Sequence, residues 1–189
     1  MSLHEQDDPQ LRAAQEQRLR EVWAPPKGLF LKWTDTNNDA VGAWYTLTAF
    51  GFMLFAGVLG LIMRSQLAVP ENDLVDAATF NQLFTLHGSM MMFLFAVPMF
   101  EAVSIILLPQ LLGARDLPFP RLSAFGYWSF LLGGVFVAGS IFFGAAPDGG
   151  WFMYPPLTTR TDLSGLGADI WMLGLSFIEV SSVATAVEL

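Results

Sequence analysis

The sequence predicts an all-α membrane protein with about four transmembrane helices, and three observations support this fold class. Hydrophobic residues make up 53% of the 189 residues and charged residues only 14%. The mean hydropathy of +0.48 is too high for a soluble domain of this length. Several uncharged runs are long enough to cross a hydrocarbon core of about 30 Å as helices. Most Lys and Arg residues lie outside these runs, in a few polar segments.

Residues 1–39 are expected to form a polar N-terminal extension, because they mix acidic and basic residues and the pair Pro25-Pro26 interrupts any helix. The segment lacks the apolar stretch and small-residue cleavage site of a secretory signal. His4 lies in this extension and is interpreted as a solvated residue.

Residues 40–189 are expected to hold the transmembrane region. Arg64 closes the first span, Pro98 predicts a kink in the second, and glycines in the third allow close helix packing. Only Glu188 follows the apolar part of the fourth span as a polar flank, so the chain is expected to end within or just after a helix. The approximate spans are 40–66, 80–112, 122–145 and 168–189.

The basic residues predict the orientation of these spans. Arg115 and Arg121 lie in the loop at 113–121, while the N-terminal extension carries most of the remaining Lys and Arg. Since short cytoplasmic loops are enriched in basic residues, this loop and the N-terminus are expected to face the cytoplasm. Arg64 and Arg160 lie on the other side, so the loops at 65–80 and 145–168 are expected to face outward.

Composition excludes several classes of site. The net charge of −8 argues against nucleic acid as a partner, because such binding needs a basic surface. The chain contains no Cys. Disulfides, thiolate zinc sites, iron–sulfur clusters and covalently attached c-type haem are therefore excluded within it.

His87 is the strongest candidate for chemistry, because it lies inside an apolar span where an unpaired polar group is costly. Two interpretations stay open from position alone. The imidazole either bonds a neighbouring helix or serves as an axial ligand of haem iron. Gly88, directly after it, allows a flat group to approach the backbone. Arg64 ends the first span on the same side, and either reaches the membrane interface or lies beside the same bound group.

Carboxylates form a second set of candidates. Glu101 and Glu179 lie within predicted spans, where they either bond neighbouring helices or relay protons. Glu101 follows His87 by fourteen residues, which in a uniform α-helix returns to within about 40° of the same face. Asp116 lies in the 113–121 loop. Trp151 belongs to an aromatic stretch typical of a membrane interface.

At this point the sequence resembles subunit I of the haem-copper terminal oxidases, over about residues 40–189. Four ordered features carry the resemblance, and together they are more specific than any one alone. They are NQLFTLHG at 81–88, Pro98 after it, GARDLPFPR at 113–121 and GWFMYPPL at 150–157. The resemblance implies that the four spans are the first part of a twelve-helix bundle.

The resemblance also implies roles for individual residues. His87 matches an axial ligand of the low-spin haem, expected to be haem A, and Arg64 matches the arginine that hydrogen-bonds the periphery of that haem. Trp151 matches a tryptophan near the haem propionates. Asp116 matches the acid at the mouth of the proton-uptake route called the D channel, and Glu101 and Glu179 are candidates for its continuation.

The sequence departs from the family in two places. Residues 100–105 replace a glycine- and asparagine-containing run that is common after Pro98, and Ser123 stands where the family often has a channel asparagine. The family places the second axial histidine, the ligands of copper B and those of the high-spin haem in later helices. This chain alone is therefore not expected to be active.

The resemblance implies a respiratory cytochrome c oxidase in the plasma (inner) membrane of a bacterium. Oxidase subunits II and III, cytochrome c and membrane lipid are its expected partners. Two other functions stay open: a small haem-b membrane anchor, which needs a second axial ligand facing His87, and an ion-coupled transporter that uses Glu101 and Glu179.

Overall fold

The computed structural model describes residues 9–22, 24, 28, 33–155, 158 and 165–189. His4, Arg160 and the pair Pro25-Pro26, which the sequence analysis considered, lie outside these described residues. The chain divides into two units, residues 1–35 and 36–189. Within the first unit, helix α1 (Pro9–Val22) buries none of its residues.

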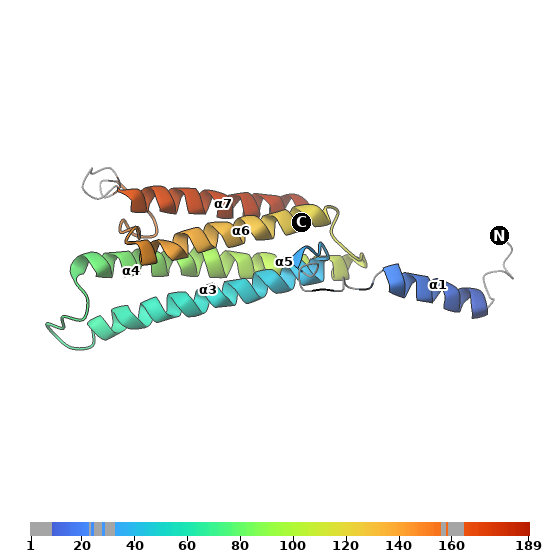
Figure 1. The fold of residues 1–189 in the computed structure, drawn as a ribbon, viewed down its shortest axis with the longest axis horizontal. Coiled ribbons are helices and arrows are strands. Elements are labelled where there is room, and N and C mark those ends of the chain that lie inside the picture. The colour runs from blue at the N-terminus through green and yellow to red at the C-terminus, as the bar shows by residue number, and fades with distance from the viewer. Residues whose placement is uncertain (1–8, 23, 25–27, 29–32, 156–157, 159–164) are drawn as a thin grey trace. The chain divides into compact units, whose positions relative to one another are not determined.

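The second unit contains four helices that are long and apolar enough to cross a membrane. They are α3 (Asn38–Gln66), the continuous helix Ala77–Leu112, α6 (Pro120–Gly139) with the 3₁₀ turn η2 (Ser140–Phe143), and α7 (Leu166–Glu188). Figure 1 shows them side by side, with α7 along α6 and α3 along the Ala77–Leu112 helix. The described residues contain no strand, which confirms the predicted all-α membrane fold.

Local signals explain where these helices begin and end. The side chain of Asn37 caps α3 by accepting a 2.9 Å hydrogen bond from the backbone N–H of Asp39. Asp76 caps α4 (Ala77–Ser89) in the same way, through the backbone N–H of Thr79. Hydrogen bonding to Thr79 lowers the pKa of the exposed Asp76 carboxyl. Gly113 ends the second long helix in the left-handed conformation, at a φ of 67°.

The Ala77–Leu112 helix changes its winding in the middle. Between α4 and α5 (Val97–Leu112), residues Met90–Ala96 form the π-helical segment η1. Its last turn is closed by the N–H of Val97 bonding to the carbonyl of Met92, five residues back. Pro98 follows directly and has no N–H to give to the turn before it, so the wider turn accommodates the proline. The sequence predicted a kink at Pro98, and the structure has a π-helical segment directly before it.

Glycines bring α6 and α7 into close contact. A Cβ atom at Gly133 would lie 2.6 Å from the carbonyl oxygen of Gly174, and one at Gly174 would lie 3.1 Å from that of Gly133. Only glycine allows the two backbones to approach this closely, as expected for helices packed in a membrane. The pair fixes α7 against α6 near the middle of both helices.

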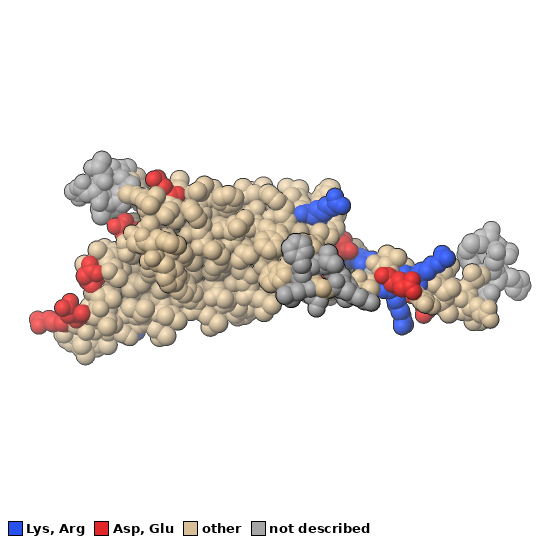
Figure 2. Space-filling view, viewed as in Figure 1, with Lys and Arg blue, Asp and Glu red and all other residues tan. Residues whose placement is uncertain are grey.

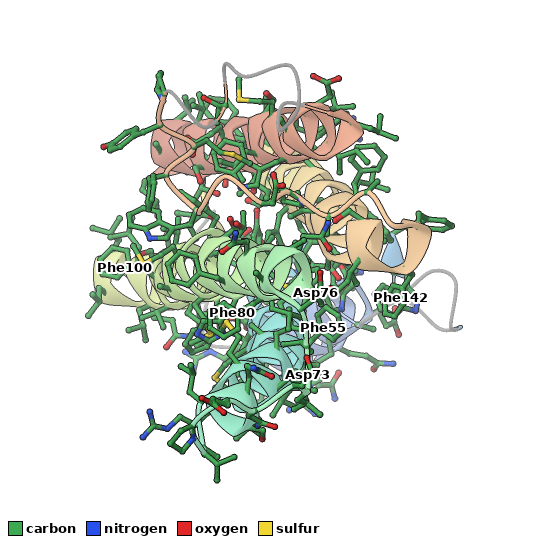
Figure 3. The ribbon with its side chains drawn as sticks, turned by 90° about the vertical axis from the view of Figure 1, so that its left-hand side faces the viewer. Phe55, Asp73, Asp76, Phe80, Phe100 and Phe142 are labelled. Atoms are coloured by element: carbon green, nitrogen blue, oxygen red, sulfur yellow. The ribbon has the colours of Figure 1, made fainter. Side chains whose placement is uncertain are left out.

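The surface of the second unit fits a bilayer. In Figure 2 the middle of the long helices shows no charged side chain, and acidic side chains lie at the end that carries the α3–α4 and α6–α7 loops. Large apolar side chains on the outer faces are exposed, among them Leu54 at 67% and Phe100 at 76%. Figure 3, which looks along the helices, shows Phe100 at the edge of the group. Such surfaces require lipid or further helices around them.

Candidate functional site

His87 is held on α4 by a hydrogen bond to a neighbouring helix. Its Nδ1 atom lies 2.8 Å from the backbone carbonyl oxygen of Ala56 on α3. A carbonyl only accepts, so Nδ1 carries the proton and the lone pair of the neutral ring is on Nε2. Fixing one ring nitrogen in this way is how proteins orient an imidazole whose other nitrogen binds a metal. The hydrogen bond and the ligand role, which were alternatives in the sequence, are thus compatible.

A single face of α3 lies against the imidazole. Ala56, Gly60 and Arg64 are spaced by four residues and therefore line one face of this helix. A Cβ atom at Gly60 would lie 3.0 Å from Cε1 of His87, so the ring rests directly on the backbone there. The exposed Arg64 follows one turn later, near the end of α3. Arg64 and His87 consequently belong to the same end of the unit, which we call the His87 end.

Trp151 packs beside Gly88, the residue that follows His87. A Cβ atom at Gly88 would lie 2.9 Å from Cδ1 of Trp151, so the indole packs against the backbone next to His87. The backbone N–H of Gly150 donates a 2.8 Å hydrogen bond to Oγ1 of Thr85, which ties this loop to α4. His87, Trp151 and the Arg64 face of α3 are therefore gathered at one end of the unit.

Two aromatic residues that the sequence analysis did not nominate extend this site. The ring of Phe93 lies 6.4 Å from Trp151 and 6.5 Å from Trp171, measured between centroids. The indole N–H of Trp171 donates a 2.8 Å hydrogen bond to the hydroxyl of Ser89. A buried tryptophan inside an apolar span needs a partner for its N–H, and that requirement could have singled out Trp171.

Asp116 lies at the opposite end, which we call the Asp116 end. One of its carboxylate oxygens accepts a 3.4 Å hydrogen bond from the backbone N–H of Asn38, at the start of α3. The other lies 3.4 Å from Nε of Arg115. Its side chain is 26% exposed, so the carboxylate is open to solvent while touching the beginning of a membrane helix.

The two intramembrane glutamates differ in environment. Glu101 is buried at 8% exposure. It lines an open pocket of about 390 Å³ together with Ser182 and Thr185. Glu179 is exposed on the described surface of α7. The structure therefore associates Glu101 with the interior and Glu179 with the periphery.

A third carboxylate, Glu188, is also buried, at 4% exposure. Its Oε2 atom accepts a hydrogen bond from the hydroxyl of Ser123 on α6. The sequence analysis treated Glu188 only as the polar flank of the last span. Its spacing from Ser181 along α7, seven residues or about two turns, is the signal that could have identified it as inward-facing.

Among the described residues of this site, the imidazole of His87 is the one strong candidate ligand for a metal ion. Among the described residues, no group of three or more His, Cys, Asp or Glu side chains is placed to hold a metal ion. One oriented imidazole is instead the kind of donor that haem iron accepts as a single axial ligand.

Comparison with known proteins gives the family. Residues 40–189 match the family model described as cytochrome c and quinol oxidase polypeptide I. The chain is 44% identical over 159 residues to a putative cytochrome c oxidase subunit 1-beta of Streptomyces coelicolor, covering 83% of this chain and 28% of that protein. It is 37% identical over 161 residues to cytochrome c oxidase subunit 1 of Corynebacterium glutamicum, covering 85% of this chain and 28% of the relative.

A third relative, cytochrome c oxidase subunit 1 of Alkalihalophilus pseudofirmus, is 40% identical over 150 residues, which are 79% of this chain and 24% of that protein. The chain thus spans about a quarter of the length of these curated relatives. The matched region contains all four long helices except the first two residues of α3. The chain belongs to the family of subunit I polypeptides of cytochrome c and quinol oxidases.

Proposed function

We propose that this chain forms the part of an oxidase subunit I that binds the low-spin haem and admits protons, with His87 as one axial ligand. The observation that carries this proposal is the 2.8 Å contact between Nδ1 of His87 and the Ala56 carbonyl oxygen. The contact fixes the tautomer in which Nε2 can bind iron. Membership of the family implies haem and copper cofactors in the full-length subunit.

The surroundings of His87 fit a haem. The imidazole packs directly on the backbone of Gly60, and the indole of Trp151 packs on Gly88 beside it. Phe93, Trp151 and Trp171 supply aromatic rings of the kind that favour a buried porphyrin. Arg64 offers a cation for hydrogen bonding to the haem periphery, and Trp151 offers an indole N–H near the propionates. When bound, the haem supplies one-electron redox chemistry.

In the full-length subunit, the proposed activity is the four-electron reduction of O2 to water. Cytochrome c is the proposed donor, and haem A, a high-spin haem and copper B are the proposed cofactors. Subunits II and III are the proposed partner chains in a bacterial plasma membrane. The basic residues Arg115 and Arg121 support a cytoplasmic location for the Asp116 end and for the N-terminal extension.

Proton uptake is proposed to begin at Asp116 and to involve Glu101. Asp116 is open to solvent at the Asp116 end, and Glu101 is a buried carboxylate deeper along α5. Exchange of either carboxylate for its amide removes a group that can accept and release a proton. Asp116→Asn and Glu101→Gln should therefore slow oxygen consumption at matched haem content. Glu179→Gln tests whether the exposed carboxylate takes part, and wild-type turnover in it would remove Glu179 from the route.

The haem assignment is tested by His87→Ala in the full-length, assembled oxidase. The reduced-minus-oxidised absorption spectrum should lose the band of the low-spin haem, because the iron loses one of two strong-field ligands. Gly57→Ala on α3 is a matched control, since a Cβ atom there meets nothing within 4 Å. A normal low-spin spectrum in a well-assembled His87→Ala enzyme would reject the proposal.

A further inference from the structure

The loop that carries Trp151 is linked to α4 by the hydroxyl group of Thr85. This hydroxyl donates a 2.8 Å hydrogen bond to the carbonyl oxygen of Asn81, one turn earlier on α4. Its single proton is used in that bond, so toward the loop it acts as an acceptor. The backbone N–H of Gly150 donates to it at 2.8 Å. Thr85 is 0% exposed, and its two bonds fix the position of Gly150 relative to α4.

The backbone on both sides of Trp151 is constrained. Gly150 has a φ of 78° and Met153 a φ of 47°, both in the left-handed region. The N–H of Met153 donates a 3.3 Å hydrogen bond to the carbonyl oxygen of Gly150, which closes a tight turn around Trp151 and Phe152. Because a non-glycine residue rarely adopts this conformation, surrounding contacts must hold the turn in place. The bond from Gly150 to Thr85 is one of these contacts.

Burial alone does not fix the indole of Trp151, which is 38% exposed in this chain. The ring packs on Gly88, where a Cβ atom would lie 2.9 Å from Cδ1 of the indole. Thr85 and Gly88 are three residues apart on α4 and therefore lie on the same face of this helix. One face of α4 thus holds both the backbone before Trp151 and the indole itself, and His87 belongs to the same turn.

We propose that Thr85 is a positioning residue that sets the place of the Trp151 indole relative to His87. This inference rests on the proposed function, in which the indole N–H lies near the haem propionates, and adds a residue to it. A hydrogen-bond donor beside the propionates offsets negative charge and so favours the reduced haem. Without the Thr85 bond the donor is no longer held there. The midpoint potential should then fall, while His87 remains an axial ligand.

Hydrogen exchange at Gly150 measures the link to Thr85 independently of the haem. In the full-length oxidase the amide proton of Gly150 should exchange slowly, because this N–H is buried and hydrogen-bonded. Thr85→Val keeps the shape of the side chain but removes the hydroxyl, so this amide should exchange about tenfold faster. Thr85→Ser keeps the hydroxyl and should exchange at the wild-type rate. Thr46→Val on α3 is the matched control, since Thr46 also donates to the carbonyl four residues back.

Redox titration of the low-spin haem tests the positioning role. The midpoint potential should fall in Thr85→Val and stay at the wild-type value in Thr85→Ser and Thr46→Val, with the low-spin absorption band retained in all three. Trp151→Phe removes the indole N–H. In that background Thr85→Val should cause no further fall, because the donor that Thr85 positions is already absent, and a double-mutant cycle measures this coupling. An equal fall with and without the indole would overturn the role of Thr85.

The outcomes separate this inference from the proposed function. Faster exchange in Thr85→Val with an unchanged potential would show that Thr85 only holds the loop, and unchanged exchange would overturn the link itself. In either case, loss of the low-spin band in His87→Ala would leave the proposed haem ligand standing without Thr85. If Thr85→Val does not assemble, Gly88→Ala displaces the indole directly, because the added Cβ atom would lie 2.9 Å from Cδ1. A lowered potential in Gly88→Ala would support the inference, and a wild-type potential would overturn it.

Discussion

The imidazole of His87 rests on the backbone of Gly60, where a Cβ atom would lie only 3.0 Å from Cε1. Gly60→Leu should therefore displace the ring and weaken or abolish the low-spin haem band, because a bulky side chain cannot fit between α3 and the imidazole. Gly60→Ala should have a smaller effect of the same kind. Absorption spectra of the assembled oxidase measure this, with Gly57→Ala as the unaffected control. Equal spectra for Gly60→Leu and Gly57→Ala would contradict the placement of His87 against α3.

Arg64 lies one turn beyond Gly60 on the face that contacts His87. Arg64→Met keeps much of the length of the side chain but removes its charge and hydrogen bonds. If Arg64 bonds the haem periphery, the absorption maximum and the midpoint potential of the low-spin haem should shift. Redox titration followed by visible absorption measures both. An unchanged potential and spectrum would return Arg64 to the role of an arginine that reaches the membrane interface.

Gly126 provides space for the bond between Tyr45 and Ser181. A Cβ atom at Gly126 would lie 3.0 Å from the hydroxyl oxygen of Tyr45, which bonds Ser181 at 2.7 Å. Gly126→Ala should destabilise the subunit by about 1–3 kcal/mol through overpacking. Gly139→Ala on the same helix should not, since nothing lies within 4 Å of its Cβ position. Thermal inactivation of the detergent-solubilised oxidase compares them, and equal stabilities would refute the close contact.

The Tyr45–Ser181 bond itself links α3 to α7. Interhelical hydrogen bonds in membranes contribute on average about 0.6 kcal/mol and at most about 1.7 kcal/mol. Tyr45→Phe and Ser181→Ala should each reduce stability, and the double variant should be less destabilised than the sum of the two. A double-mutant cycle measures this coupling. Strict additivity would show that the two hydroxyl groups do not interact.

Asp76 should make the first turn of α4 sensitive to acid. Its folded pKa is lowered by the hydrogen bond from Thr79. Its contribution to stability is therefore present above the unfolded pKa and lost as the pH falls through the folded pKa. Asp76→Asn keeps a cap but cannot titrate. Hydrogen exchange of residues 77–80, corrected for intrinsic rates, should accelerate in acid in the wild type and lose this dependence in Asp76→Asn. An identical pH dependence would exclude the cap as its cause.

The four helices could be predicted because their apolar runs are long and almost free of charge, which leaves a bilayer as their only suitable solvent. The winding of the second helix could not. The sequence analysis placed Glu101 near the His87 face of the helix by assuming a uniform α-helix. The π-helical segment Met90–Ala96 lies between the two residues. Such a segment turns the following residues by roughly the angle of one residue, about 100°. The angular relation drawn from uniform spacing therefore does not hold.

Site residues were predictable where a motif or a buried charge marked them. His87 stood out because an imidazole inside an apolar span is unusual, while Asp116 and Trp151 stood out only through their motifs. Glu188 was missed because a glutamate after an apolar run reads as a flank. Its burial depends on α6, which places Ser123 against it. Trp171 was missed for the same reason, since its partner Ser89 belongs to another helix.

The central claim, that His87 binds the low-spin haem through Nε2, is tested most directly by imidazole rescue of His87→Gly in the full-length oxidase. The variant leaves space where the side chain was, so free imidazole can supply the missing nitrogen. We expect the low-spin haem signal in the absorption and electron paramagnetic resonance spectra to be lost in His87→Gly and restored by added imidazole. A wild-type low-spin signal in His87→Gly without imidazole would contradict the account.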